Sequence, residues 1–373
     1  MKKNFDIAII GGGIIGAACA RRLAREGLRL ILIESKEIAG GTTAAGMGHL
    51  VVMDDSEAQF ALTRYSLKLW RSTAEEFPIR AEYENCGTIW VAADSEEMAE
   101  VGRKFEFYKQ RGVKAEILDE KAVSEAEPNL RKGLAGGLLV PGDSVVYQLS
   151  AARFFWEEAA RFGAELATGK SVVKIADDSL TLNDGTKISA DRVILAAGFQ
   201  TNELVPGLKI AKRKGQLVIT ESYPGFVGHQ LVELGYLKSA HSEDSDSVAF
   251  NVQPRITGQV LIGSSRSFGC DDSGVDFPML GRMLRRAFEY LPELKKMAGL
   301  RVWTGFRPAT PDNLPVIGRH PLFPKLFLAA GHEGLGITTS LGTAEILTDE
   351  ILERDSAIPR EPYSPARFEL TES

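Results

Sequence analysis

The sequence predicts an α/β protein in which a discontinuous nucleotide-binding domain is interleaved with a β-rich α+β domain. A complete βαβ unit occupies the first 34 residues, and the stretch from 215 to 263 has the pattern of strands throughout. Buried-strand and helix patterns of the nucleotide-binding type return near 191–198 and 326–352. With 373 residues, the chain also exceeds the roughly 250–300 residues at which a single core stops growing.

The first βαβ unit is the clearest element. Residues 5–10 are a short β-branched apolar run, typical of a buried parallel strand. Residues 17–26 have the composition of a helix, with Gly27 where a C′ glycine is expected. Residues 28–33 form a second apolar strand, which ends at Glu34.

The later elements follow from the same periodicities. Helical patterns occupy residues 57–77, 96–111, 150–162, 278–291 and 337–352, and strand patterns occupy 83–92, 136–141, two or three segments within 164–182, 191–197, 300–306 and 326–330. We expect residues 1–80, 147–208 and 307–365 to form the nucleotide-binding domain. Residues 81–146 and 209–306 should form the second, substrate-binding domain, and 366–373 a polar tail.

Composition excludes several classes of protein. A net charge of −6 does not favour nucleic acid as a partner. Cys19, Cys86 and Cys270 are far apart, which argues against a disulfide framework, a zinc site or a self-contained iron–sulfur cluster, so no metal is expected. No apolar stretch approaches the roughly 18 residues of a membrane helix, and no cleavage site follows the first apolar run, so we expect a cytoplasmic protein.

Gly11, Gly13 and Gly16 stand as G-x-G-x-x-G between the first strand and the first helix. The first glycine permits a tight turn, the second lets the backbone approach a pyrophosphate, and the third allows close packing of helix on strand. The helix N-terminus offers free N–H groups to phosphates, and Glu34 can accept hydrogen bonds from a ribose. This predicts a dinucleotide site; the alternative is a glycine-rich surface turn.

Two further segments suit a long cofactor with a flat ring. Residues 40–47 read G-G-T-T-A-A-G-M, whose small and hydroxylated side chains suit a second contact along an extended molecule. Residues 331–336 read G-H-E-G-L-G and precede the last helix. These glycines let the main chain pass close to a flavin, and the helix N-terminus would stabilise negative charge on the reduced ring. The alternative is a helix cap without a ligand.

Together, these motifs and Phe306-Arg307-Pro308 with residues 312–318 resemble the D-amino-acid oxidase/glycine oxidase superfamily of FAD-dependent oxidoreductases. The resemblance covers nearly the whole chain, and the last motif is most similar to D-hydroxyproline dehydrogenases and opine oxidase beta subunits. It implies FAD in a Rossmann-type domain. Some members tether FAD through a late cysteine, and because none follows Cys270 we expect non-covalent FAD. The cofactor contacts expected are Gly11, Gly13, Ile14, Ile15, Gly16, Glu34, Ser35, Gly41, Thr42, Thr43, Gly46, Met47, Val173, Ala196, Ala197, Gly198, Gly331, His332, Gly334, Leu335, Gly336, Ile337 and Thr338.

For the substrate, the resemblance implies that Arg307 clamps a carboxylate over the flavin, since a guanidinium matches a carboxylate in bidentate fashion. The alternative is a structural arginine paired with Asp312. His332 could accept a proton from the substrate amine or could merely brace its loop. Met47 and His49 lie where the family loop faces the flavin. Near residues 250–253 the family places a tyrosine over the substrate; here Asn251 or Phe250 takes that place, and Asn251 could bond a substrate hydroxyl.

The function expected is oxidation of a small D-amino or cyclic imino acid, with D-hydroxyproline as the sharpest guess. A hydride would pass from the α carbon to flavin N5, giving an imine. The alternatives are an oxygen-using glycine/sarcosine-type oxidase and the FAD subunit of an opine oxidase-like complex. The electron acceptor could be oxygen, a quinone or a partner subunit, and a homo-oligomer or hetero-oligomer is possible. A non-catalytic FAD-binding protein would not need Arg307, and a simple NAD dehydrogenase would not need the 331–336 motif.

Overall fold

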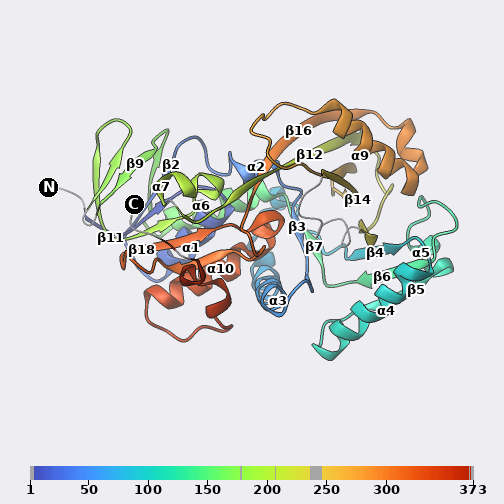
Figure 1. Ribbon diagram of the computed structural model, residues 1–373, viewed down its shortest axis with the longest axis horizontal. Coiled ribbons are helices and arrows are strands. Elements are labelled where there is room, and N and C mark those ends of the chain that lie inside the picture. The colour runs from blue at the N-terminus through green and yellow to red at the C-terminus, as the bar shows by residue number, and fades with distance from the viewer. Residues whose placement is uncertain (1–3, 177–178, 206, 236–245, 369, 371–373) are drawn as a thin grey trace.

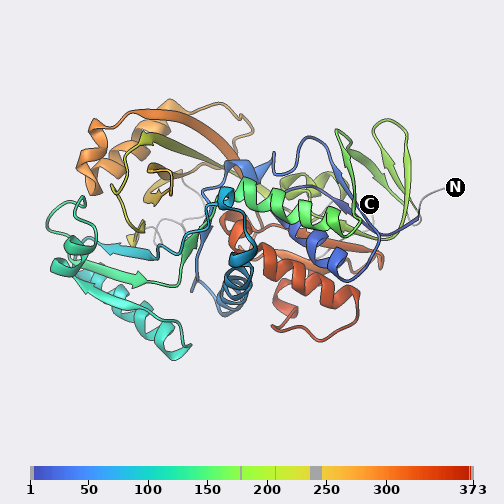
Figure 2. The same ribbon diagram turned by 180° about the vertical axis from the view of Figure 1, so that it is seen from behind.

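The computed structural model describes residues 4–176, 179–205, 207–235, 246–368 and 370. Two eight-stranded sheets lie toward opposite ends of the elongated molecule (Figures 1 and 2). The α/β class predicted from the sequence is confirmed, with two multi-stranded sheets. Within the described ranges the strands are β1 (Asn4–Ile10), β2 (Leu30–Glu34), β3 (His49–Leu50), β4 (Thr88–Ala92), β5 (Glu116–Asp119), β6 (Gly136–Val140), β7 (Ser144–Val145), β8 (Glu165–Thr168), β9 (Val172–Ile175), β10 (Leu180–Leu182), β11 (Lys187–Leu195), β12 (Ala211–Ser222), β13 (Gln230–Glu233), β14 (Ser247–Pro254), β15 (Gln259–Arg266), β16 (Gly299–Ala309), β17 (Val316–Arg319) and β18 (Leu326–Ala330).

The helices divide between the two sheets. They are α1 (Ile14–Arg25), α2 (Thr42–Ala45), α3 (Glu57–Thr73), α4 (Ser95–Gln110), α5 (Glu120–Ala126), α6 (Gln148–Arg161), α7 (Thr201–Leu204), α9 (Phe277–Tyr290) and α10 (Gly336–Ile351). Figure 2 shows α1, α6 and α10 with the first sheet, whereas α4, α5 and α9 accompany the second.

The first sheet has the strand order β17-β18-β11-β1-β2-β8, with β9 and β10 joined through β11. Its central strands from β8 to β18 are parallel, as the βαβ pattern predicts. Alternation along β1 serves two cores. Ile7 and Ile9 pack in a cluster with α1 and α10, whereas Ala8 and Ile10 pack with β9–β11 on the other face.

The second sheet has the order β16-β12-β15-β14-β13-β4-β6-β5. Its strands also alternate between two environments. Ile89, Leu231 and Phe250 face a core completed by α9, and Phe250 stacks on Tyr290 with ring centroids 4.4 Å apart. Trp90, from the same strand as Ile89, belongs to the other core cluster, which also holds buried residues of α4. This second face of the sheet is the one that turns toward the functional site.

Sheet membership follows the expected alternation along the chain, since the strands of residues 4–34, 165–195 and 316–330 form the first sheet and those of 88–140 and 211–309 the second. The domain boundaries themselves remain a prediction. The strand predicted at 83–92 begins only at Thr88. A second difference bears on the site. The strand predicted at 300–306 runs on to Ala309, because it pairs with β12 along its whole length, from Arg301 opposite Ile219 to Ala309 opposite Ala211. Arg307 therefore lies within a strand and not after one.

Candidate active site

A cavity of about 960 Å³ is lined by residues from both sheets and from the segments between them. Its size lies within the range of roughly 300–1,000 Å³ found for small-molecule and cofactor sites. One end is formed by the turn after β1 and the ends of β2 and β11, and the other by β4, β13, β14 and β16. The cavity therefore lies between the two sheets and is lined by residues of both.

At one end, the glycine motif packs as its spacing predicts. Gly11 has φ +106°, and a Cβ there would lie 2.4 Å from Ala196 O. A Cβ on Gly16 would lie 1.9 Å from Gly11 O, so Gly16 permits the helix to pack on the turn and does not itself line the cavity. Gly13 is different, because a Cβ there would meet only Thr43 Oγ1, at 3.3 Å, and Gly13 lines the cavity. Open space therefore lies over Gly13.

Side chains around this turn fix its polar groups. Ile14 N–H donates to the buried Thr43 Oγ1 at 3.0 Å, so the 40–47 segment caps the start of α1. The Glu34 carboxylate accepts from Gly12 N–H at 2.6 Å and from Lys36 N–H at 2.8 Å, and it also lines the cavity. The positive end of the α1 dipole and an oriented carboxylate thus flank the same space, as an anionic linkage and a ribose require.

The start of α10 closes the middle of the cavity. Gly331 has φ +74°, and a Cβ there would lie 2.4 Å from Thr310 Cγ2, so it shapes the turn and does not line the cavity. Gly334, Leu335, Gly336 and Ile337 do line it, on the helix N-terminal side. A Cβ on Gly46 would lie 2.6 Å from Ile337 Cδ1, so the 40–47 segment passes directly against the end of α10. Thr338 lies outside the cavity and donates to His49 O at 2.8 Å, which holds β3 in place.

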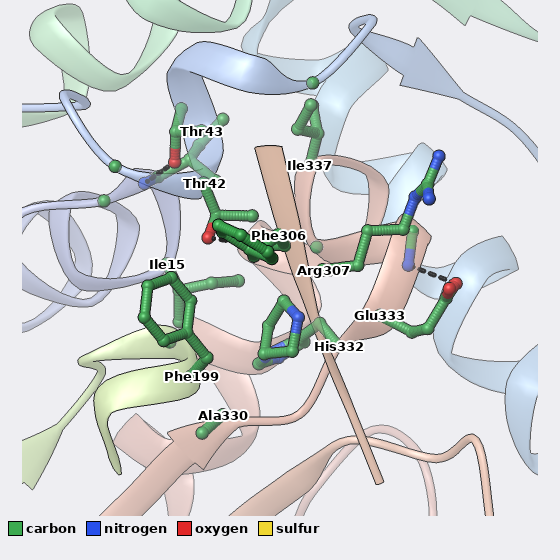
Figure 3. Close-up of a pocket in the computed structure, with 18 of the residues that line it drawn as sticks. Ile15, Thr42, Thr43, Phe199, Phe306, Arg307, Ala330, His332, Glu333 and Ile337 are labelled. Atoms are coloured by element: carbon green, nitrogen blue, oxygen red, sulfur yellow. Dashed lines mark hydrogen bonds between the residues drawn. The ribbon is translucent and has the colours of Figure 1, made fainter. Parts of the chain in front are cut away.

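Arg307 faces the cavity and does not form the structural ion pair considered as its alternative. Its Nη1 donates to Ser265 O at 3.1 Å, and the guanidinium lies over Gly215, whose Cβ would approach Nη1 to 2.6 Å. Asp312 instead pairs with Arg367, at 2.7 Å from Nε. Figure 3 shows Arg307 and Glu333 on one side of the open space and Ile15 and Phe199 on the other. The guanidinium is positioned to bind an anion in the cavity.

Two more arginines stand beside Arg307. Arg213 is its direct partner across the β12–β16 pair, and Arg266 Nη2 lies 3.4 Å from Glu333 Oε1. Like charges opposite each other on a sheet are destabilising, and Glu333 offsets this repulsion. Burial raises the pKa of Glu333, but the guanidiniums of Arg266, Arg307 and Arg213 outweigh it and lower the pKa overall. Three guanidiniums around one carboxylate give the site a positive field within an acidic protein.

His332 and His49 both line the cavity and are both neutral. Burial lowers the pKa of each to about 3. His332 Nε2 is 3.0 Å from Thr343 Oγ1, a contact within the last helix and its entry turn. This contact favours a bracing role for His332 over proton transfer. His49 Nε2 is buried and has no hydrogen-bond partner among the described residues, so it is available to a bound molecule.

Of the two side chains considered at residues 250–251, Asn251 lines the cavity and Phe250 points to the opposite face of β14. Met47 also lines the cavity, and its carbonyl oxygen accepts from Gln253 Nε2 at 3.1 Å. Two residues with polar groups that share this wall were not predicted from the sequence. Trp90 and Gln230 line the cavity beside Asn251. Period-two alternation in residues 250–253 places Asn251 and Gln253 on one face, but Trp90 and Gln230 come from other strands, so that pattern does not identify them.

Most of the residues predicted from the sequence line this one cavity, although they come from segments far apart in the chain. Gly16, Gly331 and Thr338 do not line it and support the residues that do. Those that line the cavity are Gly11, Gly13, Ile14, Ile15, Glu34, Ser35, Gly41, Thr42, Thr43, Gly46, Met47, His49, Val173, Ala196, Ala197, Gly198, Asn251, Arg307, His332, Gly334, Leu335, Gly336 and Ile337.

Comparison with known proteins agrees with this geometry. A family described as FAD dependent oxidoreductase matches residues 6–350. Glycine oxidase of Geobacillus kaustophilus is 28% identical, with 98% of each chain covered, and its crystal structure superposes with a TM-score of 0.87 over 99% of both chains at 27% identity. Hydrogen cyanide synthase subunit HcnC of Pseudomonas aeruginosa is 27% identical over 99% of this chain and 97% of its own. L-proline dehydrogenase from P. horikoshii, at 23% identity, shares the fold with a TM-score of 0.87 over 98% of each chain.

The residues present fit FAD. The uncrowded face of Gly13, the start of α1 and Glu34 would hold the pyrophosphate and a ribose, and the start of α10 with residues 41–47 would hold the ring system. Cys19, Cys86 and Cys270 do not line the cavity. Within the described ranges, no group of three or more His, Cys, Asp or Glu side chains could hold a metal ion. Across the same residues, each helix is too short or too polar to cross a bilayer.

Proposed function

We propose, for a chain that belongs through residues 6–350 to the family of FAD-dependent oxidoreductases, that it oxidises the carbon–nitrogen bond of a small α-amino or imino acid. The observation that carries this proposal is Arg307. Its guanidinium faces the cavity from the rigid strand β16, and Asp312, the carboxylate that could have neutralised it, is paired with Arg367. A substrate carboxylate is the complementary group. Relatives named glycine oxidase support an amino acid as the substrate class.

The residues of the chain have simple tasks in this reaction. When bound, FAD supplies the electron acceptor. Arg307 would hold the substrate carboxylate, and β16 would fix the position of the guanidinium that holds it. Holding reacting atoms about 3–3.5 Å apart and well oriented can lower the barrier by about 7–11 kcal/mol. The substrate loses a hydride from the α carbon and a proton from nitrogen, which yields an imine that water can hydrolyse. A neutral amine needs no strong base, which agrees with two histidines of low pKa.

Within this class we propose a D-amino or cyclic imino acid, with D-hydroxyproline as the first substrate to test. The alternative is a glycine/sarcosine-type oxidase that uses oxygen, which the relatives named glycine oxidase favour. A third possibility is an FAD subunit of a larger complex, and the relative named as a hydrogen cyanide synthase subunit is the specific reason to test for a partner. Anaerobic bleaching of the flavin by D- and L-amino and imino acids, followed by oxygen or a dye, separates these outcomes. Co-purification of a second subunit would favour the complex.

The test of the carboxylate clamp uses Arg307→Ala and Arg307→Lys. A charge-assisted hydrogen bond contributes about 1.5–3 kcal/mol, so KM for a carboxylate substrate should rise about 10- to 150-fold in Arg307→Ala. Lysine should restore little, because it lacks the planar fork. With the corresponding amino acid amide as substrate, wild type and variant should differ much less. Arg319→Ala, at an exposed position of β17, is the matched control. Unchanged kinetics in Arg307→Ala with full flavin content would rule out the clamp.

A further inference from the structure

The wall of the cavity opposite the dinucleotide end carries three buried polar atoms without partners. They are Trp90 Nε1, Gln230 Oε1 and Asn251 Oδ1, and none of them finds a hydrogen-bond partner within the described part of the chain. All three residues line the cavity and are 8% exposed or less. Leaving such a group unpaired costs about 1–3 kcal/mol each. Three such atoms on residues of one cavity wall are groups that a bound molecule could pair.

Strand register places the three side chains together. Val232 of β13 is the direct partner of Trp90 on β4 and of Asn251 on β14. Gln230 precedes Val232 by two residues, so it shares the same face of β13. Neighbouring strands lie about 4.8 Å apart, so this row forms one continuous patch. The alternate residues Leu231 and Phe250 face the core on the other side, which shows that the polar row is a feature of one face only.

The indole of Trp90 is held from behind. Lys104 Nζ, on α4, lies 4.5 Å from the centroid of the Trp90 ring, and the Lys104 side chain is fully buried. Lys104 forms an ion pair with Asp54, so its charge is compensated. A cation over an indole face is attracted to it, and this attraction favours the observed orientation of the ring. Trp90 is therefore packed within the cavity wall, and its N–H has no partner among the described residues.

We propose that Trp90, Gln230 and Asn251 form a subsite for a hydroxyl group on the side chain or ring of the substrate. This inference rests on the proposed function and adds to it the recognition of the part of the substrate remote from its carboxylate. A hydroxyl donates one hydrogen bond and accepts up to two, so it can meet both the indole N–H and a side-chain carbonyl. A second carboxylate only accepts, and it would leave both carbonyl oxygens unpaired. An aliphatic side chain would leave all three atoms unpaired.

The test compares substrates that differ by one hydroxyl. Wild type and variants are assayed with 4-hydroxyproline against proline and with serine against alanine, in both enantiomers. Wild type should favour the hydroxylated member of the pair that it oxidises best by about tenfold or more, because a polar site rejects an analogue that leaves it unpaired. Trp90→Phe keeps the ring and removes only the N–H, and it should reduce that preference about three- to tenfold. Asn251→Leu and Gln230→Met remove the carbonyl oxygens at similar volume and should act in the same direction.

Val232→Ala is the matched control, because it enlarges the same wall without removing a polar atom. It should change kcat/KM for both members of a pair by the same factor and leave the preference unchanged. Flavin content and melting temperature check that each variant is folded. A wild type without preference for the hydroxylated partner would overturn the subsite. The subsite would also be overturned if the preference for the hydroxylated substrate stays within twofold of the wild-type preference in both Trp90→Phe and Asn251→Leu.

A binding measurement separates failure of the subsite from failure of the proposed function. Titration of the oxidised holoenzyme with 3-hydroxypropionate and with propionate, followed through the flavin absorbance, needs no turnover. Tighter binding of the hydroxylated acid, reduced in Trp90→Phe, supports the subsite even if no amino acid bleaches the flavin. Equal affinities for the two acids in wild type would count against the subsite even if amino acids are oxidised.

Discussion

The glycine motif allows a sharp prediction, because its three glycines serve different purposes in the structure. Gly13→Ala should leave the fold intact and weaken FAD binding. Gly13 has φ −67° and ψ 179°, a conformation that alanine adopts freely, and the new Cβ would meet only Thr43 Oγ1 at 3.3 Å. Replacing glycine at a compatible position stabilises a protein by about 0.4–1 kcal/mol through the unfolded chain. The tight contact with Thr43 offsets part of this gain. The free energy of unfolding of the Gly13→Ala apoprotein should therefore lie within about 1 kcal/mol of the wild-type value.

The cost should appear in the cofactor. The methyl group projects into the space over the turn where a pyrophosphate would approach the backbone, and the loss of affinity should be tenfold or more, about 1.4 kcal/mol. Gly16→Ala provides the contrast, because its Cβ would lie 1.9 Å from Gly11 O and the backbone would have to move. Overpacking of this kind costs typically about 1–3 kcal/mol in the fold itself. Gly16→Ala should therefore destabilise even the apoprotein.

The assay has two parts. Urea unfolding of the apoproteins gives the free energy of unfolding, and quenching of free flavin fluorescence gives the Kd for FAD. The expected pattern is a normal fold with weak FAD binding for Gly13→Ala, and a weakened fold for Gly16→Ala. Wild-type FAD affinity in Gly13→Ala would refute the assignment of this turn to the pyrophosphate. An apoprotein of Gly13→Ala as unstable as that of Gly16→Ala would refute the packing argument.

Two other predictions concern buried charge and the cofactor linkage. Burial raises the pKa of Asp143 to about 7 although Val52 N–H donates to its carboxylate, so its contribution to stability is complete below the unfolded value of 3.8 and is lost as the pH rises through 7. The unfolding free energy of Asp143→Asn minus that of wild type should therefore increase by about 2–3 kcal/mol between pH 5 and pH 8. His49 and His332 titrate alike in both proteins, so their contributions cancel in this difference. A difference that does not change with pH would contradict the prediction. Acid precipitation should release all of the flavin into the supernatant, since no cysteine lines the cavity, and flavin retained in the pellet would show a covalent bond.

Several features could be predicted from the sequence because they are local. A strand, a glycine turn, a helix and an acidic residue at fixed spacing specify one βαβ unit, and the Gly12–Glu34 hydrogen bond and the close approach of Gly16 to Gly11 both lie inside that unit. The glycines at 331–336 and the Phe306-Arg307-Pro308 segment could be singled out for the same reason, since the signal lies in neighbouring residues. What followed from these motifs was the cofactor, the family and the residue most suited to bind a carboxylate.

The tertiary structure decided the features that depend on pairing between distant strands. Asp312 does not pair with Arg307 because it pairs with Arg367, which lies 55 residues beyond it in the chain. This long-range pair leaves Arg307 available to a substrate. The meeting of Trp90, Gln230 and Asn251 depended on the register of β4, β13 and β14, which no single segment encodes. Short-range pattern fixes which face of a strand is polar, but long-range pairing determines which polar faces come together, and that pairing forms the wall that the substrate contacts.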